Sequence, residues 1–306
     1  MPHTNDVGSP TRQGADPVGY IGLGNMGAPM ATRLLEWPGG LIVCDVRDDA
    51  VAPFLDKGAR SGTPAELAAS CSLVSVTVLD DAQVRDVVAG PDCLLTHARE
   101  GLGIAVHSTI ADTTAVELAQ LCAERGVGFV DAPVSGGASG AAEGNLATMV
   151  GASEADFAVV KPAFERWAGL VVHAGVPGAG TRMKLARNLL HFVSFTATAE
   201  AARLAEAAGL SVADLGNVVR HTDAITGGAG AIMYRDTAAP VAPGDFWEGV
   251  FGHVRGLGEK DLALALGLGD RLDVDLPLAT LSLTGLGDAL GVGPGPIATE
   301  YEENHR

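Results

Sequence analysis

The chain has 306 residues, and 47% of them are hydrophobic, which is enough to build the cores of two domains and excludes a largely disordered protein. The formal net charge of -17 argues against a nucleic-acid partner, because phosphate groups would repel so acidic a surface. No apolar run is long enough to span a bilayer, so we expect no membrane partner.

The first residues and the cysteines indicate the setting of the protein. Residues 1–16 are polar and rich in Gly, Pro, Asn and Ser, and we expect them to form a disordered leader rather than a signal peptide. The four cysteines lack the spacing of metal ligands, so we expect reduced thiols, no metal site and a cytoplasmic location.

Residues 17–180 alternate short apolar runs with amphipathic segments. The strands expected there are residues 18–22, 41–44, 73–79, 104–107, 127–130, 146–150 and 170–173. Thr63 and Glu66 form a capping-box pattern with Pro64 at the first helical position, and Ser153 opens another helix. Strands that alternate with helices predict an α/β domain with a mostly parallel, doubly wound sheet of the Rossmann type.

Residues 181–306 have a different pattern. A stretch without Gly or Pro predicts one long helix over residues 181–208 that joins two domains. Further helices are expected over residues 211–221, 246–268 and 276–290, and no strand pattern is present. The last residues, 291–306, contain two prolines and are expected to be irregular. The sequence therefore predicts an all-α C-terminal domain over residues 181–306.

A nucleotide-binding motif follows the first predicted strand and opens a helix that ends at Trp37; it consists of Gly22, Leu23, Gly24, Asn25, Met26 and Gly27. Its glycines suit a tight turn, close approach to a pyrophosphate and close packing of helix on strand. Asp45 ends the second strand, where an acid meets the ribose hydroxyls of a dinucleotide. Asp45 favours NAD because it would repel a 2′-phosphate. Arg47 lies two residues later and could bind the 2′-phosphate of NADP. The alternative is that Arg47 is a solvent-exposed charge in a loop.

A second motif follows the predicted strand at residues 127–130, and it runs Asp131, Ala132, Pro133, Val134, Ser135, Gly136, Gly137. The serine and the two glycines leave backbone N–H groups uncovered, and such groups can hold a carboxylate, although an ordinary loop has the same composition. So acidic a protein needs a local positive group to capture an anion, and Lys184 lies downstream on the long helix.

The face of the long helix that carries Lys184 continues through Asn188, His191 and Phe195. We expect these four residues to line a cleft between the two domains. For His191, and also for His253 on a later helix, a packed core position is the stronger alternative.

These blocks resemble the β-hydroxyacid dehydrogenases, whose best-known members oxidise 3-hydroxyisobutyrate. The likeness runs from residue 18 to about residue 290, and its four blocks are residues 19–27, 131–137 with 144–146, 178–188, and 260–262. The chain departs from the family pattern at Arg187, where an asparagine is common, at Val78-Leu79-Asp80, where Met-Leu-Pro is usual, and at His253, near a common aromatic position.

The resemblance implies a role for each matching residue. Lys184 would be the catalytic acid/base, and Asn188 would contact the substrate and help to place that lysine. The substrate-binding residues would be Ser135, Gly136, Gly137, Asn188 and Thr109, with His191 and His253 as further candidates. Beyond the glycine motif and the Asp45 and Arg47 already named, the cofactor-binding residues would be Val78, Leu79, Thr109 and Lys260.

The sequence thus predicts a dehydrogenase that moves a hydride between NAD and a small β-hydroxy carboxylic acid, with NADP possible. One alternative is an NADPH-dependent reductase of a small aldehyde acid of the tartronate, succinic semialdehyde or glyoxylate type. Another is imine reduction, which Lys184 argues against, and the non-enzymatic alternative is a cofactor-sensing module. The apolar C-terminal helices and the resemblance predict a homodimer or homotetramer.

Overall fold

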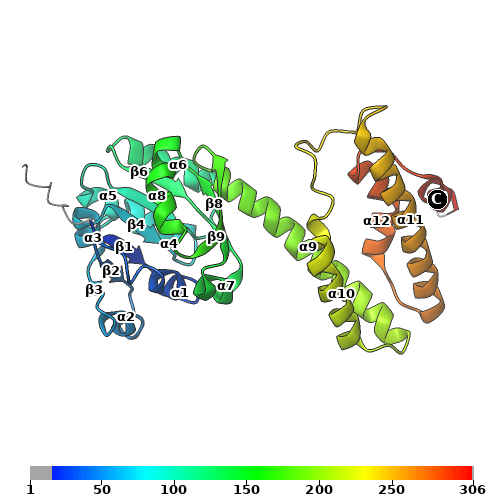
Figure 1. The fold of residues 1–306 in the computed structure, drawn as a ribbon, viewed down its shortest axis with the longest axis horizontal. Coiled ribbons are helices and arrows are strands. Elements are labelled where there is room, and N and C mark those ends of the chain that lie inside the picture. Colours follow the sequence, from blue (N-terminus) through cyan, green and yellow to red (C-terminus); the bar gives the residue numbers. More distant parts are fainter. Residues whose placement is uncertain (1–15, 305–306) are drawn as a thin grey trace, which may run out of the picture. The chain divides into compact units, whose positions relative to one another are not determined.

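The computed structural model describes residues 16–304, and the chain packs as two compact units (Figure 1). The first unit ends at Arg187 and the second begins at Asn188, inside helix α9 (Ala179–Ala207). Apart from Asp16, the predicted disordered leader lies outside the described residues. The predicted domain boundary, between residues 180 and 181, also lies inside helix α9, and it stays a prediction.

The first unit is built on one mixed sheet in the order β3-β2-β1-β4-β5-β6-β8-β7, with β9 beside β8. The strands are β1 Val18–Ile21, β2 Leu41–Cys44, β3 Arg60–Ser61, β4 Leu73–Val76, β5 Gly103–Val106, β6 Gly128–Asp131, β7 Val134–Ser135, β8 Leu146–Gly151 and β9 Ala168–Gly175. Neighbours from β3 to β6 are parallel, whereas β8 is antiparallel to β6 and β7. The predicted Rossmann-type sheet is confirmed. Strands β3 and β7 were not predicted from the sequence, because a strand of two residues is too short to show an alternation of apolar and polar residues.

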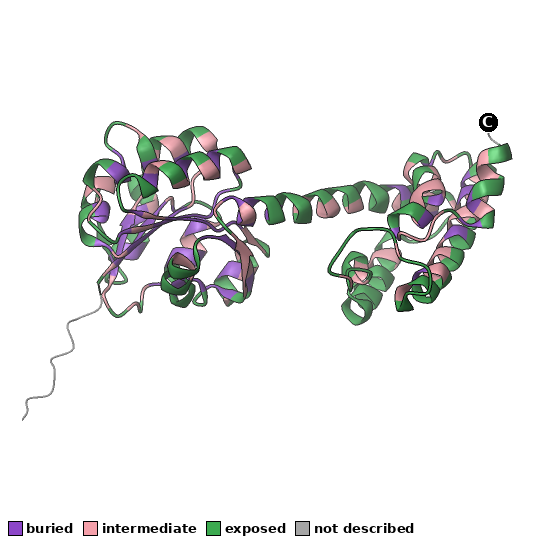
Figure 2. Cartoon of the chain, turned by 90° about the horizontal axis from the view of Figure 1, so that it is seen from above, coloured by how far each residue is buried: buried purple, intermediate pink, exposed green. Residues whose placement is uncertain are grey.

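Helices cover both faces of this sheet (Figure 2). They are α1 Gly27–Thr32, α2 Asp48–Leu55, α3 Pro64–Ser70, α4 Asp81–Ala89, α5 Leu94–His97, α6 Asp112–Ala123, α7 Gly137–Glu143 and α8 Glu154–Phe164. Successive residues of a strand point to opposite faces, so Tyr20 enters one core, with α1 and α8, while Ile21 enters the other, with α3 and α6. The central strands β1, β4, β5 and β6 are buried almost throughout, as a parallel sheet covered on both faces requires, whereas β3 at the edge is exposed.

Local capping explains where several helices begin. Thr63 and Glu66 form the predicted capping box at α3, with Pro64 at the first helical position. The Ser153 hydroxyl accepts a hydrogen bond from the Asp156 backbone at the start of α8. Helix α1 is shorter than predicted, because regular α-helix ends at Thr32 and tighter turns continue to Trp37.

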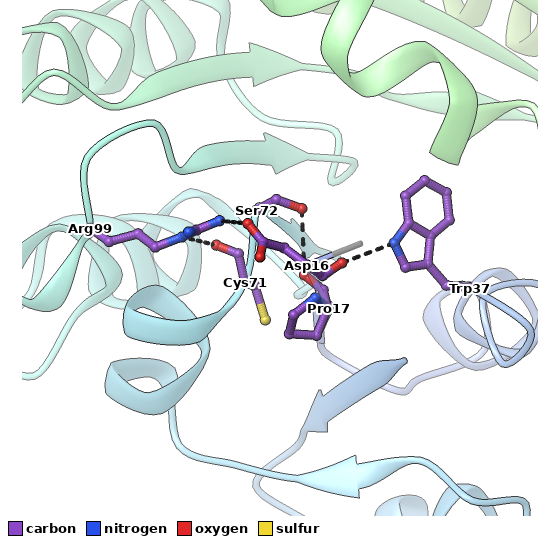
Figure 3. A network of polar contacts seen from close by, with 6 residues as sticks. All are labelled: Asp16, Pro17, Trp37, Cys71, Ser72 and Arg99. Atoms are coloured by element: carbon purple, nitrogen blue, oxygen red, sulfur yellow. Dashed lines mark hydrogen bonds and ion pairs between the residues drawn. The ribbon is translucent and has the colours of Figure 1, made fainter. Parts of the chain in front are cut away.

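The entry to β1 is held by a polar network (Figure 3). The Ser72 backbone donates to the Pro17 carbonyl at 3.0 Å, which extends the β1–β4 ladder back by one residue. Arg99 forms an ion pair with Asp16, and the Trp37 indole donates to the Asp16 carbonyl at 3.2 Å. The register of β1, whose far end carries the glycine motif, is therefore fixed from its first residue.

The second unit contains helices joined by loops and no strand in its described part, residues 188–304, which confirms the predicted all-α C-terminal region. Besides the rest of α9 it contains α10 Val212–Thr226, the 3₁₀ turn η1 Gly228–Gly230, α11 Phe246–Leu272, α12 Pro277–Ala289 and α13 Pro296–Asn304. The buried Glu200 carboxylate accepts hydrogen bonds from the backbone of Leu278 and Ala279, and it thus caps α12. None of the helices within residues 16–304 is both long and apolar enough to cross a lipid bilayer.

The prediction that residues 291–306 are irregular is wrong for α13. Pro296 stands at the first helical position, where its missing N–H costs nothing, so it starts a helix rather than preventing one. Ile297 and Tyr301 then pack against a small core around Leu266 and Leu283, and this contact stabilises the helix.

Removing the capping box should destabilise the first unit without touching its loops. We expect Thr63→Ala to lower the free energy of unfolding by about 1 kcal/mol, because the Glu66 backbone N–H loses its acceptor. Thr63→Ser keeps the hydroxyl and should unfold like the original chain. Denaturant titration of the three proteins measures the difference, and equal midpoints for Thr63→Ala and the original chain would contradict the assignment.

Candidate active site

The three glycines of the first motif have different surroundings. Gly22 has a φ of +91°, and a Cβ there would lie 2.1 Å from the Thr77 carbonyl oxygen. A Cβ on Gly27 would lie 1.9 Å from the Gly22 carbonyl oxygen, so both positions require glycine for internal packing. At Gly24 a Cβ would meet no atom within 4 Å, so its bare backbone borders open space. That space, at the start of α1, fits the approach of a pyrophosphate group.

Asp45 joins the glycine motif to the end of β2. One carboxylate oxygen accepts a hydrogen bond from the Leu23 backbone at 2.6 Å, and the other accepts from the Arg47 backbone at 2.9 Å. Burial acts to raise the pKa of Asp45, but these hydrogen bonds and the Arg47 charge outweigh it and hold the pKa below its ordinary value. The carboxylate is therefore ionised and fixed beside the loop. The Arg47 side chain contacts it at 3.4 Å.

The loops after β4 and β5 are tied together. The Ser108 hydroxyl accepts from the Val78 backbone at 3.0 Å and donates to the Val78 carbonyl at 2.7 Å. Asp80 caps α4 by accepting from the Gln83 backbone, while the Gln83 side chain accepts from the Leu79 backbone, both at 2.9 Å. The aspartate that replaces the usual proline therefore starts the helix. No role was assigned to Ser108 from the sequence, although its position just after a buried strand was a signal that could have indicated one.

The exposure of the predicted cofactor contacts differs along these loops. The side chain of Leu79 is 81% exposed although it is apolar, and Thr109 is also exposed, so both are open to a ligand. Val78 is half-buried and packs against the core below.

The loop after β6 leads into β7 and helix α7. Gly136 and Gly137 are exposed and have φ values of +131° and +70°, which side chains rarely adopt. Helix α7 begins at Gly137, so the first N–H groups of the helix lack partners within it. The loop predicted to hold an anion, residues 134–137, therefore ends at a helix N-terminus, and we call it the anion loop.

Lys184 lies against this loop. Its Nζ donates hydrogen bonds to the Val134 carbonyl at 2.7 Å and to the Ser135 hydroxyl at 2.9 Å. The residue is only 8% exposed. Burial lowers the pKa of Lys184, and the positive charge of Arg187 lowers it further. The structure thus brings together an amine of reduced basicity and the serine of the anion loop.

Asp131, at the end of β6, caps helix α9. Its carboxylate accepts hydrogen bonds from the backbone of Gly178 at 2.7 Å and of Thr181 at 2.6 Å. Burial raises the pKa of Asp131, and these bonds oppose that rise. The sequence placed Asp131 at the head of the motif without a role. An aspartate at the end of a buried strand indicates that its carboxylate has a hydrogen-bond partner inside the protein. The sequence does not show which residue that partner is.

The other predicted site residues lie in the second unit. Asn188 is half-buried, and the ring of His191 packs on that of Phe195 with a centroid separation of 4.3 Å. His253 and Lys260 are exposed, and Lys260 Nζ lies 3.0 Å from a carboxylate oxygen of Asp261. The stronger alternative of a packed core position therefore does not hold for His253. Their roles toward substrate and cofactor stay predictions.

Family models match both parts of the chain. The model of the NAD binding domain of 6-phosphogluconate dehydrogenase matches residues 17–175. The model described as NAD-binding of NADP-dependent 3-hydroxyisobutyrate dehydrogenase matches residues 178–286. The pair indicates a nicotinamide cofactor, which fits the open space at Gly24 and the ionised Asp45.

Similar proteins agree with these matches. An oxidoreductase of Mycobacterium tuberculosis is 58% identical over 94% of this chain and 97% of its own length. The 2-(hydroxymethyl)glutarate dehydrogenase of Eubacterium barkeri is 34% identical over 90% of each chain. A solved structure of an oxidoreductase from Mycobacterium avium 104 superposes with a TM-score of 0.86 at 58% identity, over 90% of this chain and 99% of that one. The chain therefore belongs to the 3-hydroxyisobutyrate dehydrogenase-like β-hydroxyacid dehydrogenases, which are NAD(P)-dependent oxidoreductases acting on hydroxyl groups.

Proposed function

We propose that the protein oxidises a small β-hydroxy carboxylic acid of the 3-hydroxyisobutyrate type with NAD, and that Lys184 is its acid/base. The observation that supports this most is the position of the Lys184 amine against the anion loop. It lies 2.7 Å from the Val134 carbonyl oxygen and 2.9 Å from the Ser135 hydroxyl oxygen. A carboxylate held by that loop would bring a hydroxyl two carbons away next to the amine. The bound nicotinamide would accept the hydride in the oxidation.

The loop has the donors that a carboxylate needs. The Ser135 hydroxyl accepts from Lys184, so its own hydrogen is available to donate to a carboxylate oxygen. The exposed backbone of Gly136 and Gly137 at the start of α7 adds N–H groups and the positive end of a helix dipole. These groups supply the local attraction that the overall acidic charge of the protein cannot.

Lys184 has the properties of a proton acceptor. An ammonium group has three N–H donors, and two are directed at Val134 and Ser135, which leaves one position for the substrate hydroxyl. The lowered pKa increases the neutral fraction that can take the hydroxyl proton in the oxidation. In the reverse direction the ammonium form would return that proton, so the same residue serves the reduction of an aldehyde acid.

Asp45 favours NAD over NADP. Its ionised carboxylate, fixed beside the glycine motif, can accept hydrogen bonds from ribose hydroxyls but would repel a 2′-phosphate. The guanidinium of Arg47 is directed at Asp45, which reduces its availability for such a phosphate.

The proton transfer can be tested by replacing Lys184. We expect Lys184→Met to lower kcat about 10²–10⁴-fold with branched and linear β-hydroxy acids, because no group remains to take the proton. Lys184→Arg keeps a positive donor that does not titrate in this range, so its kcat should fall similarly. NAD binding, measured by calorimetry, should change little in either variant. Unchanged kcat in Lys184→Met would remove the mechanism, and NAD binding without turnover of any substrate by the original chain would support a sensor.

The dependence of the oxidation rate on pH is an independent test of the role of Lys184. Oxidation should rise with pH through the pKa of Lys184 and level off above it, with the midpoint below the ordinary lysine value of 10.5. Arg187→Gln removes a positive charge that disfavours the ammonium form, so the pKa should rise and the midpoint should move to higher pH. Arg187→Lys keeps the charge and should leave the midpoint in place. A midpoint that moves down in Arg187→Gln would contradict the assignment.

Cofactor preference can be tested at Asp45. We expect Asp45→Asn to reduce the ratio of kcat/KM for NAD to that for NADP by about 10–100-fold, since a hydrogen bond to a charged group contributes about 1.5–3 kcal/mol. The amide keeps one acceptor for the Leu23 backbone. Asp48→Asn removes an equal charge from the exposed start of α2 and is the matched control. Equal ratios in Asp45→Asn and the original chain, or an equal change in both variants, would refute the role of Asp45.

We also infer that the second unit forms a homodimer or homotetramer. Helix α10 has no buried residue in the single chain, although its side chains include the exposed Val218 and Ile225. On α9, Leu189 and Phe192 are similarly exposed. Exposed apolar residues in such number are typical of a surface that another subunit covers.

The assembly can be tested by light scattering at micromolar concentration. We expect more than one subunit per particle, and we expect Ile225→Glu to shift the mass toward the monomer, because the interface would bury an uncompensated charge. Val159→Glu, at an equally apolar exposed position on α8 of the first unit, should leave the mass unchanged. A monomeric original chain would contradict the inference.

A further inference from the structure

We propose that Asp131 is a positioning residue that fixes the first turn of helix α9 and thereby holds the Lys184 amine against the anion loop. This inference rests on the proposed role of Lys184. It assigns Asp131 no contact with substrate or cofactor.

The carboxylate is bonded to the start of α9 at two points. It accepts hydrogen bonds from the Gly178 and Thr181 backbones, one on each oxygen, and only 1% of the residue is exposed. The first N–H groups of a helix have no partners within it, and they form the positive end of the helix dipole. A buried carboxylate at this place therefore forms charge-assisted bonds that are stronger than neutral ones.

The backbone around Asp131 leaves no room for another arrangement. A Cβ on Gly151 would lie 2.2 Å from a carboxylate oxygen of Asp131. A Cβ on Gly180 would lie 2.4 Å from the Met149 carbonyl oxygen and 2.5 Å from that of Asp131. The helix thus begins directly on the backbone of β6 and β8, and glycine at both positions permits this approach.

The same residue controls both sides of the contact made by Lys184. On the helix side, Thr181 lies three residues before Lys184, within one turn of α9. On the strand side, Val134 follows Asp131 by three residues. The intervening segment is held as well, because the His107 imidazole is hydrogen bonded to the Ala132 carbonyl at 2.8 Å. A displacement of the helix start would therefore move the amine relative to its partners.

Replacing Asp131 by Asn keeps the shape and one acceptor but directs an NH₂ group at a backbone N–H. The start of α9 should shift, and a misplacement of about 1 Å can cost on the order of 10²-fold in rate. We expect kcat to fall about 10–100-fold while the KM for NAD changes less than about twofold. Once Lys184 moves toward water its pKa should rise, so the midpoint of the pH profile should move to higher pH.

Two further variants separate positioning from folding. Gly151→Ala keeps the carboxylate but crowds it, so it should reproduce the loss of kcat and the shift of the pH midpoint even where Asp131→Asn fails to fold. Asp112→Asn removes an exposed carboxylate that pairs with Arg182 at 2.8 Å on the same turn of α9, and its kcat should stay within about twofold. Hydrogen exchange at the Gly178 and Thr181 amides should quicken in Asp131→Asn and not in Asp112→Asn.

The outcomes distinguish this inference from the proposed function. If Lys184→Met retains its activity, the proposed acid/base role of Lys184 fails and the positioning role falls with it. If Lys184→Met is inactive while folded Asp131→Asn keeps its kcat and its pH midpoint, only the positioning role is overturned. A lower melting temperature with kcat and midpoint unchanged would likewise overturn it, since that result marks a structural cap.

Discussion

The hydrogen bonds between the buried Asp131 carboxylate and the start of helix α9 join the two segments that carry the proposed site. Burying a charge is costly unless polar partners compensate it, and at Asp131 the backbone N–H groups of α9 supply that compensation. The start of helix α9 and the end of strand β6 are therefore held together at Asp131. The helix carries Lys184 and the strand leads into Ser135, so two segments 49 residues apart in the sequence meet at 2.9 Å. The chemistry proposed for the lysine depends on that meeting.

Two further loops of the first unit are held by similar hydrogen bonds. The strands β1, β2, β4, β5 and β6 are parallel, so their carboxyl ends lie at one edge of the sheet, where ligands bind in open α/β folds. Two loops there are held by a polar side chain from a neighbouring loop: Asp45 accepts a hydrogen bond from the Leu23 backbone, and Ser108 accepts one from the Val78 backbone. These hydrogen bonds link neighbouring loops at the edge of the sheet where a cofactor would bind.

Much of the fold followed from the sequence because its signals are local. Alternating strands and helices, the capping box at Thr63 and the three glycine roles each depend on a few adjacent residues. The errors have the same origin: Pro296 was read as a helix breaker because its position as the first helical residue depends on packing around Tyr301. The role of Asp131 was missed because its partner lies 47 residues away, at Gly178. Lys184 stood out as a positive group downstream of the glycine-serine motif, and the family resemblance gave it an expected role, but no periodicity pointed to Ser135 as its partner.

The charge distribution leaves one apparent conflict, because a protein of net charge -17 is proposed to bind an anion. Charges farther than about 8 Å are screened at physiological ionic strength, so the groups close to the loop decide the local potential. A bound carboxylate would favour the ammonium form of Lys184 and raise its pKa, which would slow the oxidation. Arg187 has the opposite effect on that pKa. In the proposed mechanism, an arginine where the family often has asparagine would attract the substrate carboxylate and at the same time favour the neutral amine of Lys184 that accepts the proton.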